Sequence, residues 1–178
     1  MLGYINFRNN KQLDDALPHG LLNAQGLGTL EQYRYGLFSF GWCGCEIIAV
    51  YNFLQMLGKP KPLSEIAREI YRYGHLLLGF FGTNVYVLPH YFKKHGIPAL
   101  HTTDKKVFLQ YAPKGRFGLV SFWTGKVMRS SIHTVAYRIE EDGGVTVFNR
   151  YNKKDFDHHY ADLAEAFASY PFLTASWV

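Results

Sequence analysis

The chain has 178 residues, a formal net charge of +5 and a hydrophobic fraction of 48%. This length predicts one domain, residues 1–178, with a substantial core, and a charged fraction of only 19% excludes an intrinsically disordered chain. The basic residues are scattered and form no nucleic-acid motif, and no apolar run approaches the roughly 20 residues that span a bilayer, so we predict neither nucleic-acid binding nor a membrane span.

The start of the chain and its cysteines bear on its location. Residues 1–12 lack the continuous apolar core of a secretory signal. The two cysteines, Cys43 and Cys45, are separated by one residue, a spacing that disulfide geometry disfavours. Without a disulfide framework we expect a reducing compartment and predict a cytoplasmic protein. The sequence carries no indication of an oligomeric state.

The first half of the chain predicts helices. Residues 1–40 show no clean hydrophobic period and predict loops and short elements. The apolar segment 47–57 covers most of a helix circumference, which is typical of a central buried helix, and Gly58 is its expected stop. Both cysteines stand where this helix begins, so its N–H groups and dipole favour a thiolate there.

Two more helices are predicted before the chain changes character. Ser64 is the expected N-cap of one helix, and Gly74 is its expected end. The Gly-rich loop 79–84 precedes another helix that reaches about Gly96, with Pro89 as a kink or as its first turn.

The second half of the chain predicts strands, with one short helix capped by Asp162. We read His158 and His159 as part of a solvated loop. Helices followed by an antiparallel sheet indicate an α+β fold. The predicted strands are 118–122, 132–140, 145–150 and 172–178.

The register of the predicted hairpin can be argued from its loop. A three-residue loop, 141–143, pairs Ile139 with Val145 and gathers the apolar residues on one face, with Gly143 at the left-handed position. In this register His133 and Asn149 are diagonal neighbours on the buried face, about 7–8 Å apart at Cβ.

These residue types suit nucleophilic catalysis. A thiolate needs a base within reach, and the base needs a third group that fixes its tautomer. Cys45, His133 and Asn149 supply the three types, and we expect the sheet that carries His133 and Asn149 to pack against the cysteine helix. Taken singly, each has an ordinary structural role: a small core side chain, a half-buried strand histidine and a turn former.

At this point the chain resembles papain-like cysteine peptidases. Residues 41–45 are similar to the papain pattern around its nucleophile, shortened by one residue. The closer resemblance is to the small bacterial peptidases that remove leader peptides after a double glycine, and to their stand-alone relatives. It covers residues 39–150 in order, including the Gly-Thr loop at 79–84 and the strands 132–135 and 147–149.

The resemblance implies a papain-like α+β fold and a Cys-His-Asn site. The helix length that it implies, counted back from Gly58, favours Cys45 as the nucleophile, with Cys43 as the alternative. The carboxylate of Glu46 should raise the thiol pKa, and the helix N-terminus and His133 would have to outweigh it.

The expected oxyanion donor is a departure from the family. Papain-like enzymes carry a Gln several residues before the nucleophile, whereas Ser39 occupies that spacing here and Gln32 is the nearest preceding Gln. We take both as oxyanion candidates, together with the Cys45 N–H. A missing donor costs about 3–4 kcal/mol in kcat, so a slow or degenerate enzyme is an alternative.

We therefore predict a thiol hydrolase that cleaves a peptide or amide bond in a peptide or protein substrate, without a cofactor. The alternatives are acyl or peptidyl transfer on the same site and a catalytically silent domain that binds a peptide. A Cys43-x-Cys45 pair with a histidine lacks the second ligand pair of a structural zinc site, so we predict no metal.

Overall fold

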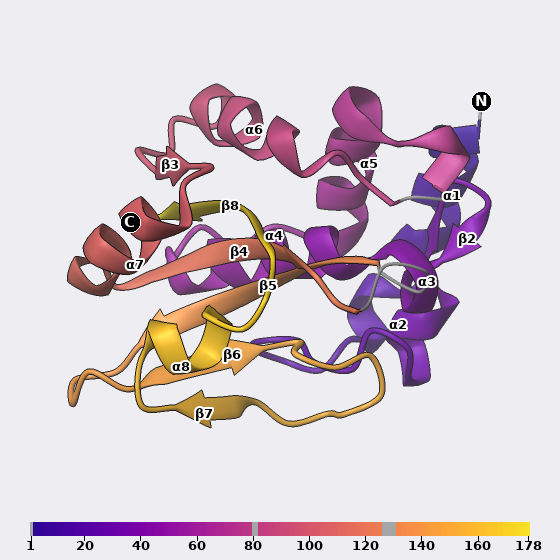
Figure 1. Ribbon diagram of the computed structural model, residues 1–178. Coiled ribbons are helices and arrows are strands. Elements are labelled where there is room, and N and C mark those ends of the chain that lie inside the picture. The colour runs from indigo at the N-terminus through magenta and orange to yellow at the C-terminus, as the bar shows by residue number, and fades with distance from the viewer. Residues whose placement is uncertain (1, 80–81, 126–130) are drawn as a thin grey trace.

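The computed structural model describes residues 2–79, 82–125 and 131–178. Within these residues the chain forms an α+β fold with helices on both faces of an antiparallel sheet (Figure 1). The sheet has the strand order β3-β8-β4-β5-β6-β7, and every neighbouring pair is antiparallel. Its strands are β3 (Leu100–Thr102), β4 (Phe117–Trp123), β5 (Ile132–Ile139), β6 (Val145–Phe148), β7 (His158–Tyr160) and β8 (Phe172–Trp177).

The helices and a small two-stranded sheet surround this sheet. The small sheet pairs β1 (Arg34–Tyr35) with β2 (Phe38–Ser39). Short 3₁₀ turns cover Asp14–Ala16, Leu77–Gly79, Val85–Val87 and Ala112–Lys114. The described α-helices are α1 (Leu2–Lys11), α2 (Gly28–Gln32), α3 (Phe40–Cys43), α4 (Cys45–Met56), α5 (Leu63–Gly74), α6 (Leu88–Lys94), α7 (Lys105–Tyr111) and α8 (Leu163–Phe167). None of them is both long and apolar enough to cross a bilayer.

The predicted central helix is confirmed as α4. Every residue from Glu46 to Leu54 is buried, as expected for a helix that is apolar nearly all round. Its end is a Schellman motif, in which the N–H of Lys59 donates to the Leu54 carbonyl at 3.0 Å. The N–H of Gly58 donates to the Gln55 carbonyl at 3.1 Å, and the φ of +72° at Gly58 suits glycine.

The two faces of the large sheet pack against different helices. Figure 1 shows α4 behind β4 and β5, and α8 in front of the sheet. The α4 face includes Leu119, Ala136 and Phe148. The opposite face packs against α7 and α8, through Val120, Phe122, Val135, Tyr137, Val147, Phe108 and Phe167.

The sheet that carries His133 packs against the cysteine helix α4, as predicted, but His133 itself lies on the other face. Because side chains alternate along β5, His133 lies on the same face of the sheet as Val135 and Tyr137. Its ring packs edge-on against Phe122, with ring centroids 5.9 Å apart. The cysteine helix α4 covers the opposite face of the sheet, the face of Ala136.

The hairpin between β5 and β6 has the predicted register. Ile139 pairs with Val145, and Gly143 has a φ of +87°. The N–H of Glu140 donates to the Gly144 carbonyl at 2.8 Å, which closes the three-residue loop. However, β6 ends at Phe148 and not at residue 150.

Several other boundaries differ from the predictions. Pro62 is the N-cap of α5, and Ser64 lies in the first turn with its hydroxyl bonded to Asp14 at 2.5 Å. His158 and His159 form an edge strand and not a loop. Residues 1–40 contain the ten-residue helix α1, and residues 80–81 of the predicted Gly-rich loop lie outside the described residues.

Pro89 lies in the first turn of α6, where its missing N–H costs nothing. Asp162 caps α8 as predicted, because its carboxylate accepts from the N–H of Glu165 at 2.7 Å. Gly74 is the last residue of α5, also as predicted.

Candidate active site

The two cysteines take different places at the start of α4. Cys45 is the first residue of α4 and is partly exposed, whereas Cys43 ends α3 and is only 4% exposed. The Cys43 thiol donates to the carbonyls of Tyr35 at 3.6 Å and Ser39 at 3.4 Å. Burial, and then the nearby Cys45, raise the pKa of Cys43 to about 12. Cys43 thus packs as a core side chain, and Cys45 is the accessible thiol.

The sulfur of Cys45 lies against the main chain on both sides of His133. Its thiol donates weakly to the carbonyl of Ile132, with a sulfur–oxygen distance of 3.9 Å, and the N–H of Thr134 donates to the sulfur. In the part of the chain that the structure describes, β6 pairs with β5 over residues 136–139 and leaves these main-chain groups without a strand partner on that side. The sulfur occupies the edge that β6 leaves free. The structure records no hydrogen bond from this sulfur to the imidazole.

His133 is held by a main-chain carbonyl. Its Nε2 lies 2.8 Å from the carbonyl oxygen of Asn149. A carbonyl only accepts, so Nε2 must carry the proton and Nδ1 keeps its lone pair. This is the tautomer that a general base needs. The predicted pair of His133 and Asn149 is therefore in contact, but through the backbone of Asn149 and not through its carboxamide.

The backbone of Asn149 explains this contact. Its φ is +56°, a left-handed conformation that Asn tolerates better than most residues. The left-handed turn directs the chain away from β6 directly after Phe148. The side chain of Asn149 is fully buried and faces a segment from the beginning of the chain.

The carboxamide of Asn149 pairs with Gln25. The N–H of Gln25 donates to Asn149 Oδ1 at 3.2 Å, and Asn149 Nδ2 donates to Gln25 Oε1 at 2.8 Å. Gln25 is itself only 4% exposed. The structure records no hydrogen bond from its Nε2 to any of the described residues.

Asn52 and Asn23 tie the segment around Gln25 to the rest of the fold. Asn52 on α4 forms two hydrogen bonds with the main chain of Leu22, at 2.7 and 2.9 Å. Asn23 Oδ1 accepts from the N–H of Asn149 at 2.5 Å. The segment is thus tied both to the cysteine helix and to the residue that holds His133.

A third asparagine brings this segment beside the approach to the thiol. The carbonyl of Asn152 accepts from Gly26 at 2.8 Å, and its side chain donates to the Gly41 carbonyl at 3.0 Å. A Cβ on Gly41 would lie 3.2 Å from the Gly26 Cα, so the two glycines pass closely. Gln25 therefore sits next to the chain that leads into Cys45.

The pKa shifts of Cys45 and His133 favour the uncharged form of both groups. Burial raises the pKa of Cys45 to about 11, against the opposing effect of N–H groups at Thr134, Glu46 and Cys45 itself. Burial also lowers the pKa of His133 to about 4, although the Asn149 carbonyl opposes this. Both shifts penalise the charged form, so the thiol and imidazole are uncharged at neutral pH unless the proton passes between them.

Glu46 follows Cys45 and is 2% exposed. Neither carboxyl oxygen of Glu46 has a hydrogen-bond partner, and burial raises its pKa to about 8. The residue is therefore mostly protonated at pH 7. The expected repulsion between Glu46 and the thiolate is correspondingly reduced below pH 8.

Arg150 lies behind the histidine in an aromatic cage. Its guanidinium carbon is 5.0 Å from the centroid of Phe122, which also packs on His133, and 4.6 Å from that of Tyr170. Arg150 is 5% exposed, and its positive charge contributes to the lowered pKa of His133. Cation–π contacts compensate part of the cost of burying this charge.

The predicted oxyanion candidates are not gathered at the thiol. Gln32 is exposed at the end of α2, and Ser39 lies in β2, where its carbonyl accepts from Cys43. The structure instead directs attention to Gln25, which the sequence did not single out. It stands 20 positions before Cys45, and the only local signal is the Asn-Ala-Gln-Gly stretch, in which Ala24 has a φ of +55°.

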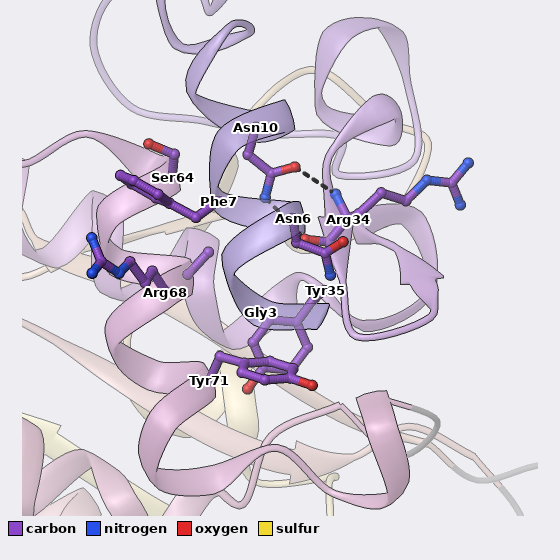
Figure 2. Close-up of a pocket in the computed structure, with 10 residues that line it drawn as sticks. Gly3, Asn6, Phe7, Asn10, Arg34, Tyr35, Ser64, Arg68 and Tyr71 are labelled. Carbon is purple, nitrogen blue, oxygen red and sulfur yellow. Dashed lines mark hydrogen bonds between the residues drawn. The ribbon is translucent and has the colours of Figure 1, made fainter. Parts of the chain in front are cut away.

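A hollow on the surface lies away from the predicted site residues. Figure 2 shows it between α1, α5 and β1, lined by residues such as Asn6, Arg68 and Tyr71. The Asn10 side chain there holds α1 to β1, because it both donates to and accepts from the main chain of Arg34 at 2.9 Å. None of the predicted site residues lines this hollow.

No group of three or more His, Cys, Asp or Glu side chains suited to a metal ion occurs in the parts of the chain that the structure describes. Comparisons with protein-family models, with curated proteins and with solved structures gave no match for this chain.

Proposed function

We propose that the protein is a papain-like thiol hydrolase that cleaves a peptide or amide bond. The observation that carries the proposal is the position of the Cys45 sulfur, at the N-terminus of α4 and against the main chain that flanks His133. Nucleophilic catalysis requires a thiol, a base and a group that fixes the base. Cys45, His133 and Asn149 fill these roles.

In this proposal each residue has one chemical task. The Asn149 carbonyl holds the Nε2 proton of His133, which leaves Nδ1 to accept the thiol proton. The thiolate of Cys45 attacks the substrate carbonyl, and His133 returns the proton to the leaving amine. Water then releases the acyl group from the sulfur.

The developing oxyanion needs donors in place before the reaction. The N–H of Cys45 at the start of α4 is one, and the free Nε2 of Gln25 is the other. This assignment replaces Ser39 and Gln32 because Gln25 is joined by hydrogen bonds to the residue that holds the base.

Thiol reactivity tests the proposal. The protein is treated with iodoacetamide between pH 5 and pH 10, and the labelled peptides are identified by mass spectrometry. We expect Cys45 to react at pH 6 at least about tenfold faster than free cysteine, because an imidazole that takes the proton supplies thiolate below the ordinary thiol pKa. Cys43→Ala should keep this reaction, and Cys45→Ala should lose it.

A second candidate is a catalytically silent domain that binds a peptide. It is favoured by the opposite pKa shifts of Cys45 and His133, both toward the uncharged forms. In that case the labelling rate of Cys45 is negligible at pH 6 and rises about tenfold per pH unit up to pH 10, as for a thiol with a raised pKa and no base beside it. For an active enzyme, product analysis with added amines separates hydrolysis from transfer.

A further inference from the structure

We infer that Asn149 positions two groups of the site through two different parts of itself. Its main-chain carbonyl holds His133, and its side-chain carboxamide holds Gln25 as the oxyanion donor. This inference rests on the proposed function. It differs from the sequence-based expectation, in which the carboxamide of Asn149 orients the histidine.

The hydrogen bonds fix the orientation of both carboxamides. A backbone N–H, that of Gln25, reaches one side-chain atom of Asn149, so this atom must be the oxygen Oδ1. The other atom is then the donor Nδ2, and its partner on Gln25 must be the oxygen Oε1. Gln25 is left with Nε2 as its free end. The pair therefore presents a donor and not an acceptor.

The contact with His133 does not depend on the side chain of Asn149. It follows from the left-handed backbone, with a φ of +56°, and from the N–H bond to Asn23. Glycine adopts this backbone without strain. Asn149→Gly therefore removes the carboxamide pair and leaves the carbonyl that holds His133.

Two reactions of the same thiol separate the two roles. With p-nitrophenyl acetate, the sulfur of Cys45 forms a bond to the carbonyl carbon, the thiol proton passes to His133, and the carbon–oxygen bond breaks to release p-nitrophenolate. This acylation passes through an oxyanion. With iodoacetamide, a sulfur–carbon bond forms and iodide leaves, so alkylation needs the thiolate and no oxyanion donor.

We expect Asn149→Gly to lower acylation by about 10²-fold, as much as Gln25→Ala does, because both remove one positioned oxyanion donor. Alkylation should stay within about twofold of the wild-type rate in both variants, since His133 is still held. The double variant should acylate no more slowly than either single variant, because the two residues act as one unit.

Asn149→Asp is an isosteric variant that disturbs the same carboxamide pair in a different way. A carboxylate has no hydrogen to give to Gln25 Oε1, so it turns the carboxamide of Gln25 and takes Nε2 for itself. We expect the same loss of acylation as for Asn149→Gly, again with alkylation retained. Thermal unfolding of each variant shows that the fold is kept.

The inference is overturned if alkylation falls together with acylation in Asn149→Gly, or if the losses of the double variant multiply. ¹⁵N NMR gives a reading that needs no activity: His133 must remain protonated at Nε2 in Asn149→Gly, and a changed tautomer also overturns the inference. A wild-type protein that is not acylated at all overturns the proposed function instead, and the oxyanion role of Gln25 with it.

Discussion

Glu46 gives a stability prediction that the structure makes quantitative. Its carboxyl group is 2% exposed, has no hydrogen-bond partner and has its pKa raised by burial from 4.5 to about 8. In the unfolded chain the group ionises near its ordinary value. The folded protein must therefore keep a proton that the unfolded chain has already lost.

The direction of the pH dependence follows from linkage. Because the pKa of Glu46 is raised in the folded state, its contribution to folding stability is fully present below pH 4.5 and is lost as the pH rises to 8. Each pH unit in this window costs about 1.4 kcal/mol, so at pH 7 the wild type loses about 3 kcal/mol relative to a group that stays neutral. Glu46→Gln supplies such a group with the same shape.

We therefore expect Glu46→Gln to be about 3 kcal/mol more stable than the wild type at pH 7 and nearly equal to it at pH 4.5. Urea unfolding followed by circular dichroism at pH 5, 6, 7 and 8 measures this difference. Glu141→Gln, in the exposed hairpin loop, is the control and should change the unfolding free energy by less than about 0.5 kcal/mol. A constant difference between Glu46→Gln and wild type across this range would refute the buried neutral carboxyl.

Three further variants test other parts of the structure. Asp14→Ala removes the acceptor of the Ser64 hydroxyl and of the Tyr33 hydroxyl at 2.9 Å, and we expect a loss of about 2–4 kcal/mol in urea unfolding. The pKa of His133 is lowered from 6.5 to about 4, so its contribution to folding stability is present above pH 6.5 and is lost as the pH falls. The wild type should therefore lose about 3 kcal/mol of unfolding free energy between pH 7 and pH 4, and His133→Gln should not show this loss. Gly36→Ala should lower the melting temperature by several degrees, since φ is +63° and a Cβ would overlap a backbone carbonyl of the facing loop.

Matched controls accompany these variants. Asp15→Ala changes the exposed neighbour of Asp14 and should be nearly neutral. Gly20→Ala tests a positive φ of +94° where a Cβ meets nothing within 4 Å, so it isolates backbone strain from overlap. Equal losses at both glycines would contradict the overlap argument, and an unchanged acid profile in His133→Gln would contradict a neutral buried imidazole.

The elements that the sequence predicted well are those with strong local signals. The continuous apolar segment and Gly58 predicted the position of α4, and Gly143 predicted the register of the hairpin. Helix α1 was missed because its buried residues are polar: Asn6 and Asn10 are hydrogen-bonded to the main chain of the following segment. The edge strands β3 and β7 are three residues long, too short for a period to be seen.

The sequence predicted which residues of the candidate site lie together, but not which of their atoms make the contact. The pairing of His133 with Asn149 was expected from the hairpin, but the extended pattern assumed for Asn149 placed its side chain at the histidine. A single left-handed residue exchanges the roles of its carbonyl and its carboxamide, and no periodicity reports such a change. The sequence around Gln25 does not indicate its partner, because Asn149 lies 124 positions away.

That separation of 124 positions has a consequence for how the protein is made. Contacts between distant parts of a chain form late in folding, because the loop between them must first be closed. During synthesis Gln25 and Cys45 leave the ribosome long before Asn149. In the proposed function, the thiol therefore acquires its base and its oxyanion donor only when most of the domain has been made. Its reactivity should report on complete folding, and a nascent or truncated chain should carry a chemically ordinary cysteine.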